Sequence, residues 1–226
     1  MRKILMLSVF AAVAFTACKK QEDTVSKLVT VSYPTVIIKS PQYYSFPVGG
    51  GPLPSANNIV ATAYDSFYHE KLQPVVDASK LSSLISGLYV ATVSAKNSYG
   101  YVGNGYVYVG ITDIHDSINI SGVYVRRLSP SDSAIVHIMK LAAGLYMSDN
   151  IAGVSSTNPG FIIPGVFVMD GDGSTLHMDK QPSTTLGTFE GANGLYDNST
   201  TDTTISYNVI NNANFGGQSR IFHKMQ

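Results

Sequence analysis

The spacing of its hydrophobic residues restricts what this chain can fold into. No segment sustains the i, i+3, i+4, i+7 repeat by which an amphipathic helix buries one face. Between residues 87 and 96, apolar and polar residues instead alternate, as in a strand with one buried face. The apolar face of this segment carries Tyr89, Ala91, Val93 and Ala95. Abundant Tyr and Gly with only 13% charged residues also favour strands and tight turns, so the sequence predicts an all-β protein.

An N-terminal β domain is expected over residues 25–113. After a turn at Asn97–Gly100, residues 106–111 form the return strand of a hairpin. Its inward residues are Val107, Val109 and Ile111. Other strands are expected at residues 28–32, 36–38 and 58–64, with Pro34 between the first two and a loop at Gly49–Pro52. The hairpin and these strands belong to one predicted domain, which resembles an immunoglobulin-like β-sandwich.

A second β domain is expected over residues 117–226. Its predicted strands cover residues 118–127, 134–141, 165–169, 174–178, 203–209 and 218–224. Asp170–Gly173 is predicted to be a hairpin turn, because Gly and Asp tolerate the positive φ that such a turn needs. Six or more short strands predict a compact sandwich or a partly closed barrel, and the sequence leaves that choice open.

The N-terminus has the pattern of an export signal. Arg2 and Lys3 precede an apolar run at residues 4–15. A helix that spans a membrane needs about 20 apolar residues, so this run is too short to do so. Phe15-Thr16-Ala17-Cys18 resembles the lipobox of bacterial lipoproteins, and Cys18 is the single cysteine. We expect residues 1–17 to be removed and Cys18 to carry lipid that holds the protein on a membrane. The alternative is an ordinary secretory signal with an incidental cysteine.

Residues 18–24 then form the lipidated cysteine and a polar tether. Glu22 and Asp23 resemble the signal by which lipoproteins of the Bacteroidota reach the outer leaflet. The expected location is therefore the outer membrane, with the protein exposed at the cell surface. The alternative is that these residues are a spacer without a role in export.

The charge balance argues against nucleic acid as a partner. Removal of residues 1–17 leaves 209 residues, and the loss of Arg2 and Lys3 leaves 13 basic against 15 acidic side chains, a net charge of −2. Binding to nucleic acid needs a basic surface, which this composition does not supply.

No motif indicates catalysis, a metal or another cofactor. The chain lacks a Gly-x-Ser-x-Gly elbow, and Gly49–Gly51 lacks the Gly-Lys-Ser/Thr of a phosphate-binding loop. Asp170-x-Asp172 could wrap calcium, but Gln181 stands where an EF-hand loop needs Glu. The five histidines show no zinc-ligand spacing, and no pair among three Glu and twelve Asp identifies itself as catalytic. We therefore expect a protein that is not an enzyme, with a hydrolase whose Asp residues cluster only in space as the alternative.

Tyrosines at the predicted hairpin are the candidate ligand-binding residues. They are Tyr99, Tyr101, Tyr106 and Tyr108. The last two point away from the inward valines, and exposed Tyr rings suit stacking on sugars or recognition of proteins. The alternative is that they stabilise the sheet across strands or pack against the second domain.

Four Asp-Ser/Thr sites resemble the O-glycosylation acceptor of Bacteroidota envelope proteins. The acceptors are Ser117, Thr24, Ser133 and Thr203. Of the four, Ser117 is the leading candidate for glycosylation, because it lies in the junction between the domains, where a glycan could be accommodated.

Three local motifs carry a wider resemblance. Gly87-x-Tyr89 is similar to the tyrosine corner of immunoglobulin-like domains. With Ile120-Ser121-Gly122-x-Tyr124 and Gly144-Leu145-Tyr146, the chain resembles Bacteroidota surface lipoproteins that join an immunoglobulin-like domain to a C-terminal β-sandwich of lipocalin-like type, a group of unassigned activity. The resemblance implies non-catalytic binding at the cell surface, with carbohydrate as the leading ligand. The alternatives are adhesion to another envelope protein and a small apolar ligand inside the second domain.

Overall fold

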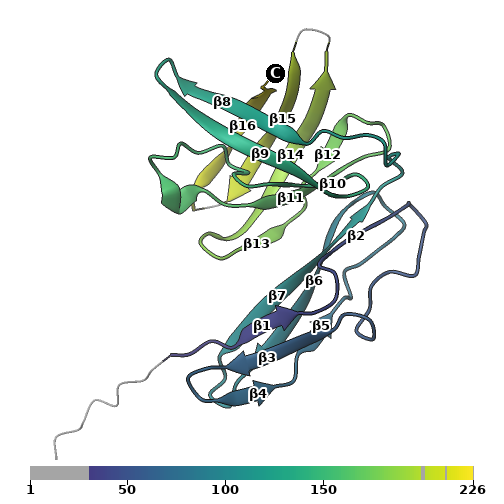
Figure 1. Ribbon diagram of the computed structural model, residues 1–226, viewed down its shortest axis with the longest axis vertical. Coiled ribbons are helices and arrows are strands. Elements are labelled where there is room, and N and C mark those ends of the chain that lie inside the picture. Colours follow the sequence, from purple (N-terminus) through teal and green to yellow (C-terminus); the bar gives the residue numbers. More distant parts are fainter. Residues whose placement is uncertain (1–30, 200–201, 212, 226) are drawn as a thin grey trace, which may run out of the picture. The chain divides into compact units, whose positions relative to one another are not determined.

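The computed structural model describes residues 31–199, 202–211 and 213–225. From Ser32 onward the chain forms one compact unit built of strands (Figure 1). The helix in the described part is the short 3-10 turn η1 (Pro159–Phe161), and no helix there is long and apolar enough to cross a membrane. The predicted all-β class is confirmed. The expected signal peptide, Cys18, the tether and Thr24 lie outside the described residues.

Two small sheets form the N-terminal half. One has the order β1 (Thr35–Ile38), β3 (Ala61–Asp65) and β4 (Glu70–Leu72), and the other has the order β2 (Tyr43–Phe46), β7 (Val102–Ile111), β6 (Gly87–Lys96) and β5 (Val75–Asp77). Their pairings are antiparallel apart from β2 with β7. The predicted hairpin is confirmed as β6–β7, although its second strand begins at Val102 rather than at residue 106.

Small aliphatic side chains fill the space between these sheets. The buried members of this core are Ile59, Ala91, Val93, Val107, Val109 and Ile111. The predicted inward faces of β6 and β7 are therefore confirmed. On the same face of β7, a Cβ on Gly103 would overlap the carbonyl oxygen of Pro34, so the residue must be glycine for the chain to pass this close.

The C-terminal half is a closed antiparallel barrel of eight strands. Around the barrel the order is β8 (Gly122–Ser129), β9 (Asp132–Ala142), β10 (Leu145–Ser148), β11 (Gly165–Met169), β12 (Thr175–His177), β14 (Gly187–Asn198), β15 (Thr203–Asn211) and β16 (Phe215–Lys224), which pairs again with β8. A ninth short strand, β13 (Gln181–Ser183), pairs with the first residues of β14. The alternative left open by the sequence is thus decided in favour of the barrel.

Barrel closure depends on β14, which sequence analysis did not predict. The segment is rich in Gly, Asn and Asp, which are depleted in strands. A Cβ on Gly194 would overlap the carbonyl oxygen of Leu176, and a Cβ on Gly191 would lie 2.7 Å from the Cβ of Met178. Asn193, at a register shift, has a φ of 54°. The glycines of β14 lower its strand propensity, so the sequence does not indicate a strand there. The same glycines let β12 and the residues after it approach β14 closely.

The remaining differences concern short strands. β2, β4, β5, β10 and β13 were not predicted as strands, because three or four residues are too few for alternation to show. Residues 31 and 32, expected to end a strand, are not in one. The division of the chain at residues 113–117 stays a prediction.

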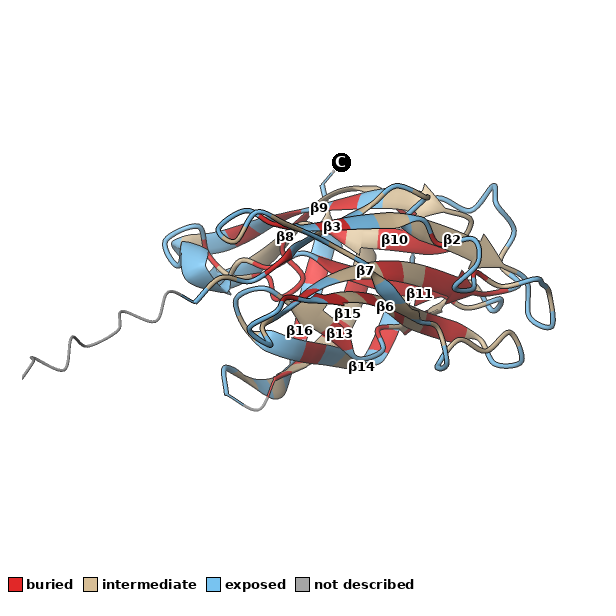
Figure 2. Cartoon of the chain, turned by 90° about the horizontal axis from the view of Figure 1, so that it is seen from below, coloured by how far each residue is buried: buried red, intermediate tan, exposed pale blue. Residues whose placement is uncertain are grey.

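Large aromatic side chains fill the barrel. Its core is a cluster of sixteen buried residues, six of them aromatic: Tyr124, Tyr146, Phe167, Phe189, Tyr207 and Phe222. Figure 2 shows the buried positions alternating with exposed ones along the strands. The ring of Tyr146 stacks on that of Phe167 with their centroids 5.8 Å apart. The barrel interior is therefore a packed core where these residues lie.

A third cluster joins the two halves. Leu88 of β6 packs with Leu145, Val166 and Val168 of the barrel. Across the same contact, Asp179 Oδ2 accepts a hydrogen bond from the Leu88 N–H at 2.8 Å. This contact fixes the outer face of β6 and β7 beside barrel strands β10 and β11.

Candidate functional site

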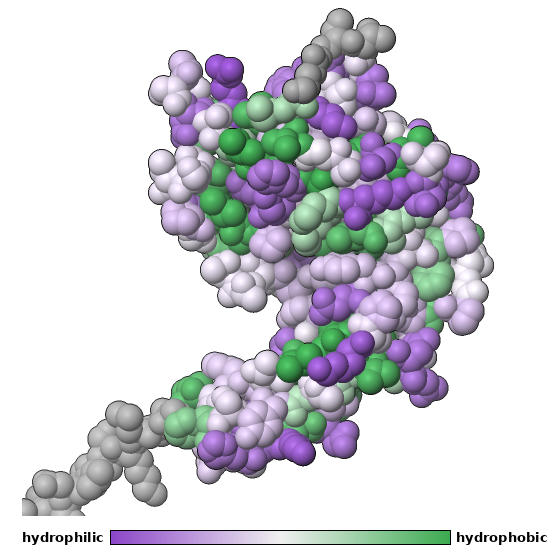
Figure 3. Space-filling model, in the orientation of Figure 1, coloured by the Kyte–Doolittle hydropathy of each residue, from purple (hydrophilic) through white to green (hydrophobic). Residues whose placement is uncertain are grey.

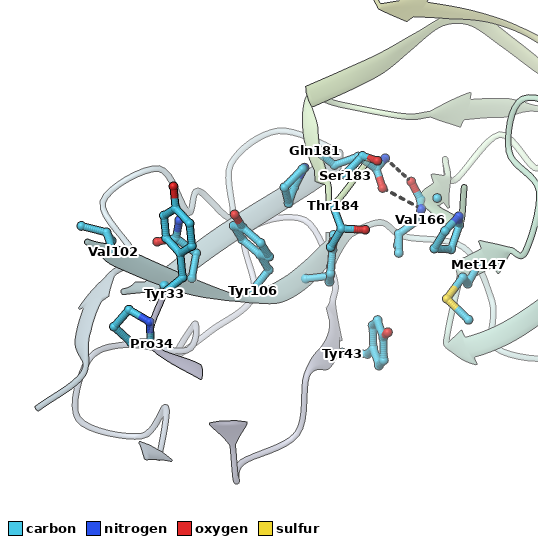
Figure 4. Close-up of a pocket in the computed structure, with 16 residues that line it drawn as sticks. Tyr33, Pro34, Tyr43, Val102, Tyr106, Met147, Val166, Gln181, Ser183 and Thr184 are labelled. Atoms are coloured by element: carbon cyan, nitrogen blue, oxygen red, sulfur yellow. Dashed lines mark hydrogen bonds between the residues drawn. The ribbon is translucent and has the colours of Figure 1, made fainter. Parts of the chain in front are cut away.

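A groove of about 660 Å³ lies between the outer face of β7 and the barrel. Figure 3 shows the surface hollowed there, and Figure 4 shows the residues that line the groove. Alternate residues of a strand share a face, so Asn104, Tyr106 and Tyr108 of β7 all point to the groove side. Gln181 of β13 and Met147 of β10 belong to the opposite wall.

Two of the four predicted tyrosines lie in this groove, and each has a different environment. Tyr108 stacks on Tyr43 with centroids 5.8 Å apart and planes at 17°, and both rings pack against the cluster that joins the halves. Burial raises the pKa of Tyr108 to about 12, and the neighbouring Tyr43 adds to this effect. Tyr108 therefore packs against the second half of the chain, as the alternative to ligand binding predicted. Tyr106, two residues earlier, lines the open groove.

The other two predicted tyrosines lie near the tip of the hairpin. Tyr101 contacts Tyr33 edge-to-face at 5.6 Å, and Tyr33 lines the outer end of the groove. Tyr99 is 64% exposed and stacks on Tyr68 at 4.1 Å, in a cluster that also contains Phe67. The structure therefore brings Tyr106 and Tyr108 together with two tyrosines that were not predicted for the site, and leaves Tyr99 in a separate aromatic cluster.

The walls of the groove present polar groups without charge. In the described part of the chain, no Lys, Arg, Asp, Glu or His is among the residues that line it. The side chains of Asn104, Tyr106, Tyr33 and Thr184 form no hydrogen bond with another residue in the described part of the chain, so they are free to bind a ligand. Such a site suits a ligand that is uncharged and carries many hydroxyl groups.

Gln181 has a structural role in the same groove. Its amide oxygen accepts the Val166 N–H at 2.8 Å, and its amide nitrogen donates to the Val166 carbonyl at 2.8 Å (Figure 4). The side chain is buried and its hydrogen-bonding capacity is used. Gln181 therefore fixes β13 as a wall.

The tip of the hairpin is held by a buried pair that the sequence analysis missed. Asn97 Oδ1 accepts the N–H groups of Tyr99 and Tyr101, and Asn97 Nδ2 donates to Asp65 at 2.7 Å. Burial alone would raise the pKa of Asp65, but hydrogen bonds from Asn97, Tyr68 and others lower it below its ordinary value. Asp65 lies on the same face of β3 as Ala63, which is buried. This alternation is the sequence pattern from which a buried Asp65 could have been predicted.

Charged side chains gather in a neighbouring groove of about 510 Å³, which shares Tyr106, Gln181 and Pro182 with the first groove. Its charged lining residues are Asp77, Asp179, Glu190, Lys80 and Lys180. Asp77 accepts hydrogen bonds from the hydroxyl and N–H of Ser79, which lower its pKa, and Asp179 binds the Leu88 N–H. Two of the three carboxylates therefore hold the backbone in place.

The predicted turn at Asp170–Gly173 is confirmed between β11 and β12. Asp172 accepts hydrogen bonds from the Thr175 hydroxyl and N–H and from the Ser174 N–H, which lower its pKa to about 2. Asp170 lies 3.2 Å from His177 Nε2. Within residues 31–199, 202–211 and 213–225, no three His, Cys, Asp or Glu side chains form a group that could hold a metal ion.

The described O-glycosylation candidates lie in three settings. Ser117 is exposed between β7 and β8, with its hydroxyl 2.7 Å from His115 Nδ1. Ser133 is exposed on β9, and Thr203 begins β15 with its hydroxyl donating to Asn198. Glycosylation at each site stays a prediction.

Known proteins give little guidance. No protein-family model matches the sequence, and no curated protein matches it. Among solved structures, the chain is similar to the crystal structure of the lipoprotein BT2262 from Bacteroides thetaiotaomicron, at 16% identity. The match covers 84% of this chain and 100% of that one, with a TM-score of 0.37. A likeness this distant carries no inference about activity, ligand or location.

Proposed function

We propose that this protein is a lipid-anchored envelope protein that binds neutral carbohydrate in the groove beside β7, without catalysing a reaction. The observation that carries the proposal is the composition of that groove. Tyrosine rings line it, amide and hydroxyl groups without partners border it, and none of the described residues that line it is charged. Lipid anchoring rests on the context of Cys18 in the sequence.

A sugar matches this combination of groups. The C–H faces of a sugar ring are apolar and lie flat against an aromatic ring, while its hydroxyls need donors and acceptors around the edge. Tyr106 offers the ring, and Asn104 and Thr184 offer the polar groups. A volume of about 660 Å³ is within the range of small-molecule sites, about 300–1,000 Å³.

The absence of charge in the groove supports binding without catalysis. Hydrolysis of a glycosidic bond uses two carboxyl groups about 5–9 Å apart on either side of the bond. Among the residues that the structure describes, no carboxylate lines this groove. A sugar bound here would therefore meet no acid or base from the lining residues.

A second candidate function rests on the separate aromatic cluster near the hairpin tip. Phe67 and Tyr99 are more than half exposed, and Tyr64 nearby is 39% exposed. Exposed aromatic groups of this kind favour contact with another protein. This is the adhesive function expected as the first alternative. The third alternative, an apolar ligand inside the barrel, is less favoured, because large side chains pack the interior.

A binding screen with matched variants tests the proposal. The soluble chain from residue 19 onward is applied to a glycan array, and each hit is measured by calorimetry against Tyr106→Ala and Tyr99→Ala. We expect neutral glycans to bind, Tyr106→Ala to lose about tenfold or more in affinity, and Tyr99→Ala to bind as the parent does. Equal loss in both variants, or binding of acidic glycans alone, would contradict this assignment. Failure of every glycan to bind would favour the adhesive function.

A further inference from the structure

Two arginines point into the barrel near one end. Arg126 on β8 and Arg220 on β16 lie on inward-facing positions, whereas Arg127 is exposed on the outer face of β8. Tyr207 on β15 is directly opposite Arg220 in the strand register. β8, β16 and β15 are consecutive strands of the barrel, so the three inward side chains belong to one patch of its wall.

These side chains have almost no polar partners. Arg220 is only 9% exposed, yet its side chain forms no hydrogen bond or ion pair with any residue that the structure describes. By hydrogen-bond geometry, its Nε and the Tyr207 hydroxyl are both buried without a partner among the described residues. The Ser148 side chain is a polar group near Tyr207, and it lowers the pKa of Tyr207 against the larger effect of burial. Arg126 has one partner, the carbonyl oxygen of Gly153 at 2.9 Å. Buried polar groups are almost always paired, so two orphans side by side call for an explanation.

The charges are also uncompensated. No carboxylate forms an ion pair with either guanidinium in the described part of the chain. Burial lowers the pKa of Arg220, the charge of Arg126 lowers it further, and Tyr207 raises it. Asp149 influences Tyr207 but is itself bound to His137, 2.6 Å away. A cation removed from water without an anion is destabilising.

The surroundings hold the two arginines in position. A Cβ on Gly153 would lie 2.6 Å from the Phe222 ring and 2.8 Å from Arg126 Cδ, so Arg126 is confined against this loop. The Arg220 guanidinium lies over the Phe215 ring, 5.0 Å from its centroid, and Phe161 meets Phe215 edge-to-face. Stacking of this kind offsets part of the cost of burial but satisfies no N–H group.

We propose that this end of the barrel binds the oxyanion group of a small ligand, held by the guanidinium groups of Arg126 and Arg220 and by the Tyr207 hydroxyl. A carboxylate, sulfate or phosphate supplies the acceptors and the negative charge that these groups lack. Phe215 and the partly exposed Phe161 give an apolar border to the site. The site is distinct from the uncharged groove and does not depend on its function.

Thermal unfolding of the soluble chain tests the site. Chloride is replaced at constant ionic strength by phosphate, sulfate or benzoate, which separates inorganic anions from a carboxylate on an apolar body. We expect at least one of them to raise the melting temperature in a saturable way. Arg220→Met should melt at a higher temperature than the parent in chloride, because an unpaired buried charge is removed, and should lose the response to the anion. Arg127→Met is the control and should keep it.

A third variant protects the test against a folding defect. Tyr207→Phe keeps the volume of the side chain and removes only the hydroxyl, so it should fold and bind the anion about tenfold more weakly. The proposal is overturned if none of the three anions acts beyond chloride. It is also overturned if Arg220→Met and Tyr207→Phe respond as Arg127→Met does, since that result would indicate an adventitious ion only.

Discussion

Ile85–Val90 in the N-terminal half and Ile120–Val125 in the barrel differ at one of six positions. Their backbones match as well. Gly87 and Gly122 have φ values of 155° and 150°, and in each segment the following tyrosine donates a hydrogen bond to the carbonyl of the residue four positions earlier. Yet Tyr124 is fully buried in the barrel core, whereas Tyr89 is half-buried at the edge of a small core. The local sequence determined the local structure, and the surrounding fold determined the burial.

The same contrast extends to the aromatic residues of the two halves. The barrel uses its rings inside, where six of them fill the core, while the N-terminal half has a core of small aliphatic residues. Tyr44, Phe46 and Tyr89 only border that core, and several other tyrosines of the N-terminal half lie on the outer face of β7 or near the hairpin tip. An aromatic residue can contribute to binding only where the core does not use it, which is why the aromatic rings that line the candidate site all come from the N-terminal half.

The largest loss of stability is expected from substitutions that remove a buried side chain from each core. Phe167→Ala should lower the free energy of unfolding by about 3–5 kcal/mol, because it leaves a large cavity in the barrel. Val93→Ala removes two methyl groups from the N-terminal core and should cost about 2 kcal/mol. Urea unfolding followed by circular dichroism measures both. Equal losses of unfolding free energy in the two variants would contradict the distinction between an aromatic barrel core and an aliphatic N-terminal core.

Barrel closure gives the next effect. Gly194→Ala places a methyl group against the backbone of β12 and should destabilise the protein by about 1–3 kcal/mol. Gly216→Ala is the matched control, because a Cβ there would meet nothing within 4 Å. Thermal unfolding of the two variants should separate them clearly. If Gly194→Ala melts like Gly216→Ala, close approach of β12 is not what requires the glycine.

The two similar tyrosines permit a direct comparison. Tyr124→Phe leaves the buried Ile120 carbonyl without its partner and should cost about 1–3 kcal/mol. Tyr89→Phe leaves the exposed Ile85 carbonyl, which water can reach, and should cost less than about 1 kcal/mol. Urea midpoints of both variants provide the test. A larger loss for Tyr89→Phe would mean that the motif matters more than its burial.

The smallest effect concerns acid. The pKa values of Asp65 and Asp172 lie below the ordinary 3.8, with Asp172 at about 2. Folding thus favours the ionised forms, so the stabilisation is complete above pH 3.8 and disappears as the pH falls through each lowered pKa. Asp65→Asn and Asp172→Asn should each reduce the loss of stability between pH 4 and 2, Asp172→Asn only slightly because its carboxylate is exposed. Acid titration of unfolding measures this, and an unchanged slope in Asp65→Asn would contradict it.

Part of the candidate site could be predicted from the sequence. Alternation along β7 placed Tyr106 and Tyr108 on the outer face, because side chains of a strand alternate whatever its partners are. Tyr33 and Tyr43 could not be assigned, since they come from other segments and reach the groove only through the pairing of β2 with β7 and the contact with Tyr101. The opposite wall, β13, is three residues long and has no pattern of its own.

The sequence by itself determined the class of fold and the local geometry. The two-residue period, the turn at Asp170–Gly173 and the paired Gly-x-Tyr segments depend on interactions within a few residues, so they can be recognised in the chain. Only the tertiary structure decided that the second half closes into a barrel and which tyrosines meet in a groove. The orphaned environment of Arg220 and Tyr207 likewise appears only there. Strand closure and burial are set by residues far apart in the sequence, and glycines such as Gly194 show their purpose only when the neighbouring strand is in place.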